Sequence, residues 1–569
     1  MAAAFCAPLI AVAGAAQAGP ALATPVANAP AGHWSNVREI PLTSLNAGAG
    51  AIVTALACAS PGNCTAGGKF ADSEGNVQIF VVSEVKGTWQ KPGTIPGLNG
   101  TSIGAVAHIS SISCPAVGDC VAAGSFGDQS GAQRPFIAES KNGSWHRPVP
   151  LTFSPFSVDP VEEFDAKSVS CATPGNCTVG LVVPVFASAN RTAQEAFVVD
   201  EVNGVWGGAQ AVPDTPALND GLDAETSAVS CFSPGNCLAG GWYTHNHEHP
   251  FIATETAGSW GAATVLPGVS QLPGFGSNTS ATIKSASCWS AGNCTVTGIY
   301  NATDATQGFL AVETDGTWST SAISGPDGPS SGTNTHVTGL SCNSSGSCAI
   351  VGTFFDGAGS HGFVLSGTSG ARLFTGLNGN VEADAVACAA NRCIAAGTAE
   401  GSSFGQFREF VADETGGTWS AARPVGGKLT AGNVGGLVTA ASCAAPGNCV
   451  IGGAIDDAND QSHAFVAEES PATKTSLTLS KTSIRFGQEQ AERITVKVSP
   501  RTGGTPSGKV LVKAGSATLC TVTLAKGKGS CVLGSRKLRP GRYKVAATYG
   551  GDSVYSGSAS GIKMLTVTK

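Results

Sequence analysis

Three histidines of one short segment have the residue type and spacing of a metal site. His245, His247 and His249 occupy every second position of the segment. If the segment continues as one β-strand, its alternation places all three imidazoles on one face, where they could bind zinc. The alternative is a polar hairpin loop in a protein that has nine histidines. The sequence therefore gives a candidate metal site here, and it predicts no other cofactor.

Acidic residues that belong to single loops are the other candidates for chemistry. Clustered carboxylates can bind calcium or hydrolyse glycans, although none of these groups has the ligand spacing of an EF-hand loop. The groups are Asp72 with Glu74; Glu162, Glu163 and Asp165; and Asp456, Asp457 and Asp460. The chain has no nucleophile-elbow, phosphate-loop, zinc-protease or dinucleotide motif. A carbohydrate-active enzyme thus stays open, but no catalytic residue is named.

The cysteines show which elements must position these side chains. Cys6 lies in a predicted signal peptide, and the other cysteines form nine local pairs. Fixed spacing and an even number in an exported chain indicate disulfides, and the usual spacing of seven pairs, C-x5-C, exceeds that of zinc ribbons. The pairs are Cys58/Cys64, Cys114/Cys120, Cys171/Cys177, Cys231/Cys237, Cys288/Cys294, Cys342/Cys348, Cys388/Cys393, Cys443/Cys449 and Cys520/Cys531.

The first eight pairs mark eight repeats, with 46 to 60 residues between successive first cysteines. Repeats of this length are typical of solenoids and propellers. The pattern of each unit predicts four short strands. The first ends at Ser-Cys, and a Pro-Gly-Asn turn leads to the second. A variable loop leads to the third, and a Gly-x-Trp turn precedes the fourth. The variable loops and the mouth of the central channel are therefore the expected binding face.

The Gly-x-Trp turns indicate how the repeats close. They carry Trp89, Trp145, Trp206, Trp260, Trp318 and Trp419, whereas the eighth repeat ends at Phe465–Glu469 without one. Gly32-His33-Trp34, however, precedes the first repeat. An N-terminal strand that completes the last unit removes the open edge of the array. The prediction is an all-β, eight-bladed β-propeller closed by this strand.

A glutamate follows the third strand in six repeats, which favours a structural role such as accepting hydrogen bonds from turn amides. These residues are Glu84, Glu201, Glu255, Glu313, Glu414 and Glu469. A catalytic acid would differ from its repeat mates. No residue of this set is therefore predicted to be catalytic.

Residues 32 to about 470 resemble a family of secreted actinobacterial proteins with Ser-Cys-x-x-Pro-Gly-Asn-Cys repeats, and β-propeller proteins more generally. The resemblance implies the fold and export, but no activity. From Pro471 the cysteine repeat stops. Residues 504–510 and 538–552 resemble bacterial immunoglobulin-like repeats of surface proteins, which implies a β-sandwich. Cys520/Cys531 would staple one hairpin of it.

Four segments are expected along the chain: a signal peptide at 1–18, an Ala/Pro-rich linker at 19–31, the propeller at 32–470 and the immunoglobulin-like domain at 471–569. The signal segment lacks a basic n-region, so either the true start lies upstream or the signal is atypical. No later stretch is predicted to span a membrane. The expected location is extracellular or associated with the cell wall.

Charge divides sharply between the two expected domains. Residues 1–471 hold 15 Lys/Arg and 36 Asp/Glu, whereas residues 472–569 hold 17 and 3, and the whole 569-residue chain is at −7. This balance speaks against nucleic acid as the partner of the whole chain. The sequence favours a non-enzymatic binding protein whose ligand is a glycan or an anionic envelope polymer. A glycoside hydrolase or lyase on a propeller scaffold is the alternative, and a purely structural envelope component is a third.

Overall fold

The computed structural model describes most of the chain after the first 32 residues. The described residues are 33–34, 37–45, 47–98, 107–154, 156–158, 164–188, 191–219, 223–303, 305–324, 334–367, 370–401, 407–425, 435–459, 461–470, 473–500, 505–552 and 555–569. The expected signal peptide and linker lie outside them.

Eight antiparallel sheets of four or five strands follow the cysteine repeat and are here called blades 1 to 8. Blades 1 to 4 are β3 (Ala47–Ser60), β4 (Asn63–Asp72), β5 (Val77–Val85), β6 (Thr88–Trp89); β7 (His108–Ala116), β8 (Asp119–Gly127), β9 (Gln133–Lys141), β10 (Ser144–Trp145); β11 (Asp165–Thr173), β12 (Asn176–Ser188), β13 (Arg191–Val202), β14 (Val205–Trp206), β15 (Gln210–Ala211); and β16 (Ala224–Ser233), β17 (Asn236–His245), β18 (His247–Thr256), β19 (Ser259–Trp260), β20 (Thr264–Val265). Blades 5 to 8 are β21 (Ala281–Ser290), β22 (Asn293–Asn301), β23 (Thr306–Thr314), β24 (Thr317–Ile323); β25 (Asn334–Cys342), β26 (Cys348–Asp356), β27 (Gly359–Ser366), β28 (Arg372–Leu373); β29 (Val381–Ala389), β30 (Arg392–Glu400), β31 (Phe407–Thr415), β32 (Thr418–Trp419), β33 (Arg423–Pro424); and β34 (Gly435–Ala445), β35 (Asn448–Asp456), β36 (Ser462–Ser470) with β1 (His33–Trp34) and β2 (Arg38–Glu39).

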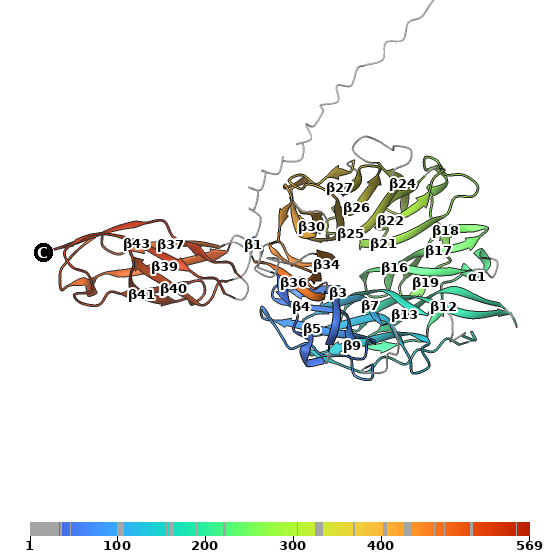
Figure 1. Ribbon diagram of the computed structural model, residues 1–569, viewed down its shortest axis with the longest axis horizontal. Coiled ribbons are helices and arrows are strands. Elements are labelled where there is room, and N and C mark those ends of the chain that lie inside the picture. Colours follow the sequence, from blue (N-terminus) through green and yellow to red (C-terminus); the bar gives the residue numbers. More distant parts are fainter. Residues whose placement is uncertain are drawn as a thin grey trace, which may run out of the picture.

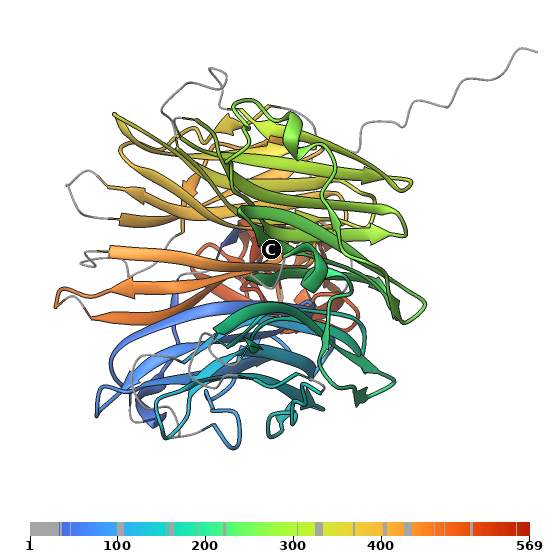
Figure 2. The same cartoon turned by 90° about the vertical axis from the view of Figure 1, so that its right-hand side faces the viewer.

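The first strands of the blades form a closed ring at the centre of the molecule. Each contacts the first strand of the next blade, from β3 through β7, β11, β16, β21, β25, β29 and β34, and β34 contacts β3 again. In Figure 1 these strands surround one centre, and Figure 2 shows the same sheets after a quarter turn. The predicted eight-bladed propeller is confirmed.

The N-terminal segment closes the ring, as the orphan Gly-His-Trp predicts. Trp34 lies opposite Glu469, and Glu39 lies opposite Phe465, so β1 and β2 both pair with β36. Trp34 is 7% exposed and packs with buried residues of blades 7 and 8. The last blade therefore has no open outer edge along this pairing.

One phenylalanine at the same place in every third strand forms the core of each blade. All eight are completely or almost completely buried, and each packs in a cluster that joins two neighbouring blades. They are Phe80, Phe136, Phe197, Phe251, Phe309, Phe363, Phe410 and Phe465.

The serine of the Ser-Cys motif joins neighbouring blades at the innermost strands. Its hydroxyl accepts a hydrogen bond from the backbone N–H of the first cysteine of the next blade, and six of the eight junctions have this bond. The pairs are Ser113–Cys171 (3.1 Å), Ser170–Cys231 (2.9 Å), Ser230–Cys288 (2.9 Å), Ser287–Cys342 (3.2 Å), Ser341–Cys388 (3.0 Å) and Ser442–Cys58 (3.0 Å). Ala57 and Ala387 replace the serine in blades 1 and 7. The motif thus links blades as well as disulfide loops.

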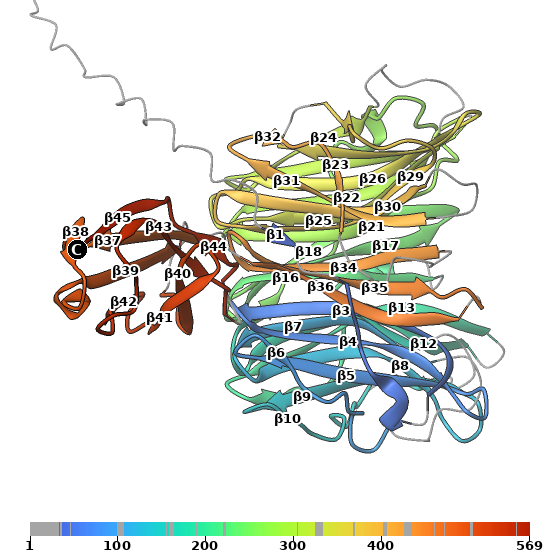
Figure 3. The same ribbon diagram turned by 60° about the vertical axis from the view of Figure 1, so that its left-hand side comes forward.

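The C-terminal residues form a sandwich of two sheets beside the ring (Figure 3). The strands are β37 (Thr473–Leu479), β39 (Arg493–Pro500) and β42 (Lys528–Val532) in one sheet, and β38 (Ser483–Arg485), β45 (Lys563–Thr568), β43 (Gly541–Tyr549), β40 (Lys509–Ala514), β41 (Ala517–Thr523) and β44 (Ser558–Ala559) in the other. The alternating residues Ile494, Val496, Val510, Val512 and Val545 are buried between the sheets, as the pattern predicts.

A disulfide joins the two cysteines of each of the nine pairs. The prediction that Cys520/Cys531 staples a hairpin is wrong, because β41 and β42 belong to different sheets. The bond therefore ties the two layers of the sandwich together.

The second cysteine of every propeller pair is buried in the core of its blade, whereas the first is half-buried. The cysteine spacing predicts the pairing. It does not predict that the second cysteine lies in the core and not at an exposed turn. The physical reason is that each is the first or second residue of the second strand of its blade, which has neighbours on both sides. The buried residues are Cys64, Cys120, Cys177, Cys237, Cys294, Cys348, Cys393 and Cys449. Each is bonded to its partner, so none has a free thiol for a metal or for catalysis, and they are residues of the scaffold.

The helices are short: α1 (Thr215–Leu218) and the 3-10 turns η1 (Leu42–Leu45), η2 (Val269–Gln271) and η3 (Glu489–Ala491). Among the described residues, no helix has the length and apolar character needed to cross a membrane.

Replacing Trp34 by Ala tests the closure. The change removes a buried indole of the closing strand from between blades 7 and 8, so we expect the free energy of unfolding to fall by about 3–5 kcal/mol. Urea unfolding measures it. Trp318→Ala is the control, because this half-buried indole is not on the closing strand and should cost less. Equal losses in the two variants would contradict the closing role of Trp34.

Replacing Ser230 by Ala tests the serine junctions. It removes the acceptor of the Cys288 N–H between blades 4 and 5, and the expected loss is about 1 kcal/mol. Ser233→Ala, in the disulfide loop of the same blade, should change stability by less than about 0.5 kcal/mol. The idea fails if both substitutions have the same effect in thermal unfolding.

Candidate functional site

The disulfide loops and the Gly-x-Trp turns are hydrogen-bonded to each other at one end of blades 1 to 5. In blade 1 the backbone N–H of Gly87 donates to the carbonyl of Gly62 at 2.8 Å, and the Asn63 side chain accepts from the N–H of Lys86 at 3.1 Å. Gly62 has a φ of +71°, and a Cβ there would lie 2.8 Å from Gly87 N. Gly and Asn of the Pro-Gly-Asn motif are therefore both used to join the two turns, which confirms that these turns share one face. We call it the disulfide-loop face.

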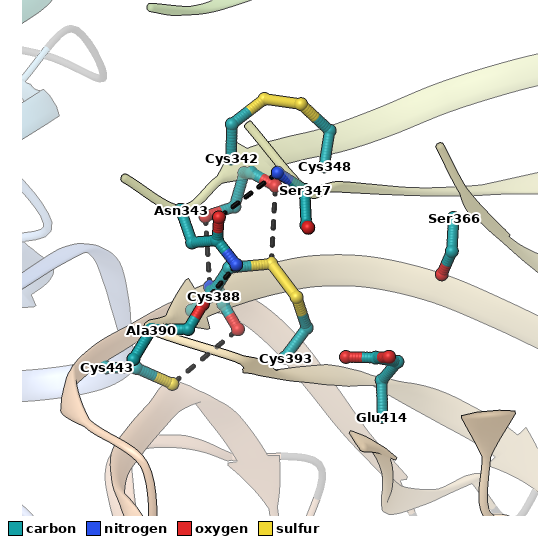
Figure 4. Close-up of a disulfide and its surroundings, with 12 residues drawn as sticks. Cys342, Asn343, Ser347, Cys348, Ser366, Cys388, Ala390, Cys393, Glu414 and Cys443 are labelled. Atoms are coloured by element: carbon teal, nitrogen blue, oxygen red, sulfur yellow. Dashed lines mark hydrogen bonds between the residues drawn. A yellow bond between two sulfur atoms is a disulfide. The ribbon is translucent and has the colours of Figure 1, made fainter. Parts of the chain in front are cut away.

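Blade 6 builds this junction differently (Figure 4). Asn343 follows the first cysteine directly, accepts hydrogen bonds from the N–H groups of Ser345 (3.0 Å) and Ser347 (3.1 Å), and donates to the carbonyl of Ala390 in blade 7. Ser366 and Glu414 lie at the same junction in Figure 4. An altered repeat thus still links its neighbour.

The tryptophan of the fourth strand reaches the preceding blade. The indole N–H of Trp206 donates to Glu139 at 2.8 Å, and that of Trp260 donates to Asp200 at 2.9 Å. Trp89 likewise donates to Glu468, and Trp419 to the hydroxyl of Ser366. The acceptor is always the third residue after the buried phenylalanine. Sequence reasoning missed this partner because the residue type at the acceptor position varies between repeats. Only its spacing of three residues from the phenylalanine is constant.

The junction of blades 1 and 2 lacks these carboxylates. Ser83 and Ser140 occupy the two interface positions, and the Ser83 hydroxyl lies 3.3 Å from that of Thr65. The Trp145 indole makes no hydrogen bond with another described residue. A cavity of about 650 Å³ opens at this junction on the disulfide-loop face. Loss of the acid therefore coincides with a space beside an unpartnered indole, and we call this space the blade 1–2 cleft.

The lining of the blade 1–2 cleft is mostly neutral and combines apolar side chains with a set of polar ones. Its walls include the indole of Trp145, amides and hydroxyls, one lysine and one glutamate. The side chains that matter for recognition are Asn63, Thr65, Gln90, Lys91, Asn142 and Trp145. An aromatic surface beside several hydrogen-bonding groups suits a neutral, hydroxyl-rich ligand.

The next junction holds a pair of carboxyl groups. Glu139 and Glu201 hydrogen-bond to each other, and the Lys141 ammonium lies 2.9 Å from Glu139. Burial opposes ionisation of Glu139, but hydrogen bonds from Glu201, Lys141 and Trp206 hold its pKa below the usual value. Burial, and then the neighbouring Glu139, raises the pKa of Glu201 to about 8. The pair lines a cavity of about 230 Å³.

This pair does not have the spacing of a glycosidase. Retaining and inverting enzymes hold their two carboxyl groups about 5 Å or more apart, with the scissile bond or a water between them. Glu139 and Glu201 instead share a hydrogen bond directly. The pair therefore resembles two acids that share one proton. It does not resemble the separated acid and nucleophile of a glycosidase.

Related buried acids recur at other junctions, which indicates an architectural role. Burial, and then Glu468, raises the pKa of Glu84 to about 8, and burial with Asp200 raises that of Glu255 to about 7. Glu414 accepts a hydrogen bond from the N–H of Gly417, which is the turn-amide role expected for the set. Most of the recurrent glutamates thus face a neighbouring blade, not their own turn.

The predicted loop acids lie at the opposite end of the blades. Asp72 accepts hydrogen bonds from the N–H groups of Glu74 and Asn76, both at 2.9 Å, and Asp457 accepts from those of Asn459 (2.8 Å) and Gln461 (3.1 Å). Asp456 accepts from the hydroxyl of Ser462. These carboxylates shape their own loops. Glu162, Glu163 and Asp460 lie outside the described residues.

Asp165 is the loop acid that the fold brings together with other charged groups. It is almost completely buried at the start of β11, 3.1 Å from His108 Nε2 and 3.4 Å from Lys167 Nζ. Lys167 also lies 3.7 Å from Glu225 in blade 4. Blades 2, 3 and 4 are thereby joined by a hydrogen bond and two ion pairs at the end of the innermost strands opposite the disulfide loops.

The three histidines lie on two strands. His245 ends β17 and His247 begins β18, because Asn246 adopts a left-handed conformation with a φ of +65° between them. The expected single strand is therefore wrong, yet the hairpin still gathers the rings, with 4.2 Å between the centroids of His247 and His249 and 6.5 Å between those of His245 and His249. The described residues contain no group of three His, Cys, Asp or Glu that could hold a metal ion, and zinc binding here stays a prediction.

The family model of the bacterial Ig-like domain (group 3) matches residues 477–568, which are the two-sheet sandwich. The C-terminal domain is a bacterial Ig-like domain. No curated protein matches the chain significantly.

Solved structures with similar folds include the lectin BP39L of Burkholderia pseudomallei, at 15% identity over 67% of this chain and 100% of the lectin, with a TM-score of 0.36. A puromycin-hydrolysing peptidase of Mycobacterium tuberculosis has 11% identity over 70% of this chain and 56% of the peptidase, with a TM-score of 0.40. The polysaccharide lyase Uly1 has 12% identity over 66% and 93%, with a TM-score of 0.38. Similarities at this level assign no ligand or reaction to this chain.

The buried acids predict how stability depends on pH. Six carboxyl groups have a pKa raised to about 7 or 8, in each case mainly by burial: Glu84, Glu195, Glu201, Glu255, Asp384 and Glu409. The unfolded chain releases these protons near pH 4 to 5. The folded chain keeps them until pH 7 to 8, so it binds more protons in between and loses stability as the pH rises.

We therefore expect the apparent Tm of the full chain to fall by several degrees between pH 5 and pH 8.5 in thermal unfolding. Glu84→Gln combined with Glu201→Gln should flatten this decline, since a neutral amide replaces the protonated carboxyl at both sites. A Tm that is constant over this range, or a decline that the double variant leaves unchanged, would contradict the assignment.

Proposed function

We propose that this chain is an extracytoplasmic binding protein without catalytic activity, and that its propeller holds a neutral glycan in the blade 1–2 cleft. The observation that carries the proposal is the cavity beside an unbonded indole at this junction; the Trp318 indole also makes no hydrogen bond with a described residue, so the missing bond alone does not define a site. Four other junctions use the tryptophan N–H to bond the preceding blade, whereas here the acceptor is missing, Trp145 makes no hydrogen bond with a described residue, and a cavity of about 650 Å³ lies beside it.

The disulfides support the compartment. Nine disulfides in one chain are typical of proteins that fold in an oxidising environment outside the cytoplasm. Residues 1–18 serve in this proposal as the export signal, 19–31 as a linker, 32–470 as the binding ring and 471–569 as a separate C-terminal domain. The protein then works as a secreted or wall-associated module.

An enzyme is the second candidate, and one observation favours it. Glu139 and Glu201 have pKa values displaced in opposite directions, as an acid and a base often do, and they line a cavity. Their direct hydrogen bond argues against glycoside hydrolysis, and equivalent buried acids at other junctions argue for a structural role. Binding without turnover is therefore the better supported function.

Replacing Trp145 by Ala tests the cleft. The full chain is screened on an array of immobilised neutral glycans, and the best oligosaccharide is titrated by calorimetry. We expect Trp145→Ala to weaken binding by about tenfold or more, because the indole surface is lost. Trp260→Ala is the matched control, since Trp260 occupies the same position in blade 4 but is bonded to Asp200. It should leave the Kd within about twofold.

Two results would overturn the proposal. One is equal weakening by the two tryptophan variants, which would place the effect in the ring as a whole. The other is release of reducing ends from the bound glycan at a rate that Glu139→Gln and Glu201→Gln abolish, which would establish the enzyme. Thermal unfolding of each variant checks that the ring is intact.

A further inference from the structure

The bacterial Ig-like domain carries many cations and no carboxylate that is free to neutralise them. All three of its acidic residues accept hydrogen bonds from backbone N–H groups of its own loops. Glu492 accepts from Ser480 (2.8 Å) and Lys481 (2.7 Å), Glu489 from Arg536 (2.9 Å), and Asp552 from Ser507 (2.7 Å) and Tyr555 (2.8 Å). Glu489 and Glu492 are also completely buried. No ion pair of 4 Å or less joins described residues of this domain.

The outer face of the three-stranded sheet shows the imbalance in its register. Exposed Lys497 on β39 lies directly opposite exposed Lys528 on β42, and Ser476 on β37 completes the row. Like charges in this relation destabilise a sheet. The exposed positions of the three strands are mostly hydroxyl and basic residues, with no acid among them. Such a face does not stabilise the domain. It does attract an external anion, which would offset the repulsion between the lysines.

A groove at the edge of the sandwich continues this face. It has a volume of about 550 Å³ and joins β37 of one sheet to β38, β43 and β45 of the other. Two cations, Arg542 and Lys563, line it with the hydroxyls of Thr478, Thr482, Ser483 and Thr566. Neither cation makes a hydrogen bond or ion pair with another described residue. Thr478 belongs both to the groove and to the exposed row of β37, so the two surfaces are continuous.

We propose that this groove, with the adjoining lysine face, binds an acidic polysaccharide. The guanidinium of Arg542 can take a carboxylate by two parallel hydrogen bonds, and Lys563 supplies a second positive charge. The surrounding hydroxyls suit the neutral hydroxyl groups of the sugar rings. A chain fits better than a single ion because Lys497 and Lys528 extend the positive surface beyond the groove.

The position of the groove favours an external ligand over the acidic ring of the same molecule. Ser483 begins β38, and in Figures 1 and 3 the C-terminus lies at the end of the domain away from the blades, with β38 beside it in Figure 3. This site is independent of the blade 1–2 cleft, which lies in the propeller and suits a neutral ligand. The protein then has two ligands of different charge on its two domains.

The test compares two double variants of the full chain that remove equal charge. Arg542→Ser with Lys563→Ser alters the groove, and Lys509→Ser with Lys513→Ser removes two exposed cations from β40 outside it. The probes are polygalacturonate, its methyl ester with the same backbone, and duplex DNA, titrated at low and high salt. The wild-type chain should bind polygalacturonate, and more weakly as salt rises.

We expect the groove variant to bind polygalacturonate about tenfold or more weakly, and the β40 variant to stay within about twofold of wild type. The neutral ester should not bind. Equal losses in the two variants, equal binding of the ester, or tighter binding of DNA would overturn the proposal, since each points to something other than a carboxylate site in the groove. Unchanged oligosaccharide binding by the groove variant separates this result from the function proposed for the propeller.

Discussion

Closure of the ring by its own N-terminus is the constraint on which the rest of the structure depends. The segment that holds Trp34 pairs with β36, more than 400 residues later, and supplies the outer strand that the last blade lacks. The junction it completes is also chemically distinct. Buried Arg392 of blade 7 bonds both Asp413 of its own blade and Glu469, the residue opposite Trp34. A buried cation held by two acids resists separation, because either acid would be left with an unpaired charge in a dry interface. Pairing and charge thus close the ring together.

Within the closed ring, most junctions use the same positions, and a local substitution therefore has a local consequence. The serine before six of the first cysteines, the phenylalanine of the third strand and the tryptophan of the fourth are architectural, and the residue that receives the tryptophan is the variable one. An acid there ties two blades, and a second acid from the next blade creates a shared proton. At Ser83 the Trp145 indole has no acceptor among the described residues and a cavity lies beside it, whereas the Ser366 hydroxyl at the same position of blade 6 still accepts from Trp419. A repeat protein can acquire a site in this way without changing its scaffold, since the other junctions carry the stability.

Much of this fold could be predicted from the sequence because the signals are local or periodic. Cysteine spacing indicated the repeats, and an orphan Trp34 with an incomplete last repeat indicated the closure. The failures share a physical cause. Which neighbour a side chain faces depends on how blades pack, so the acceptors of Trp206 and Trp260 were not visible in any one repeat. The eleven-residue separation of Cys520 and Cys531 fits a hairpin and a link between sheets equally well. The loop acids, Asp72 among them, resembled free ligands until their own backbone amides were found to occupy them.

The separation of charge between the domains follows from where each places its carboxyl groups. The propeller buries many acids between blades, where several hold a proton near neutral pH, so its formal charge of −21 for residues 1–471 overstates the charge it presents. The bacterial Ig-like domain uses its three acids inside its own loops and leaves the cations outside. Its surface charge is therefore close to its formal +14 for residues 472–569, and no rearrangement within the domain can lower it. Attraction between the two domains is weaker than the formal charges imply, while the basic domain keeps its full attraction for an external polyanion.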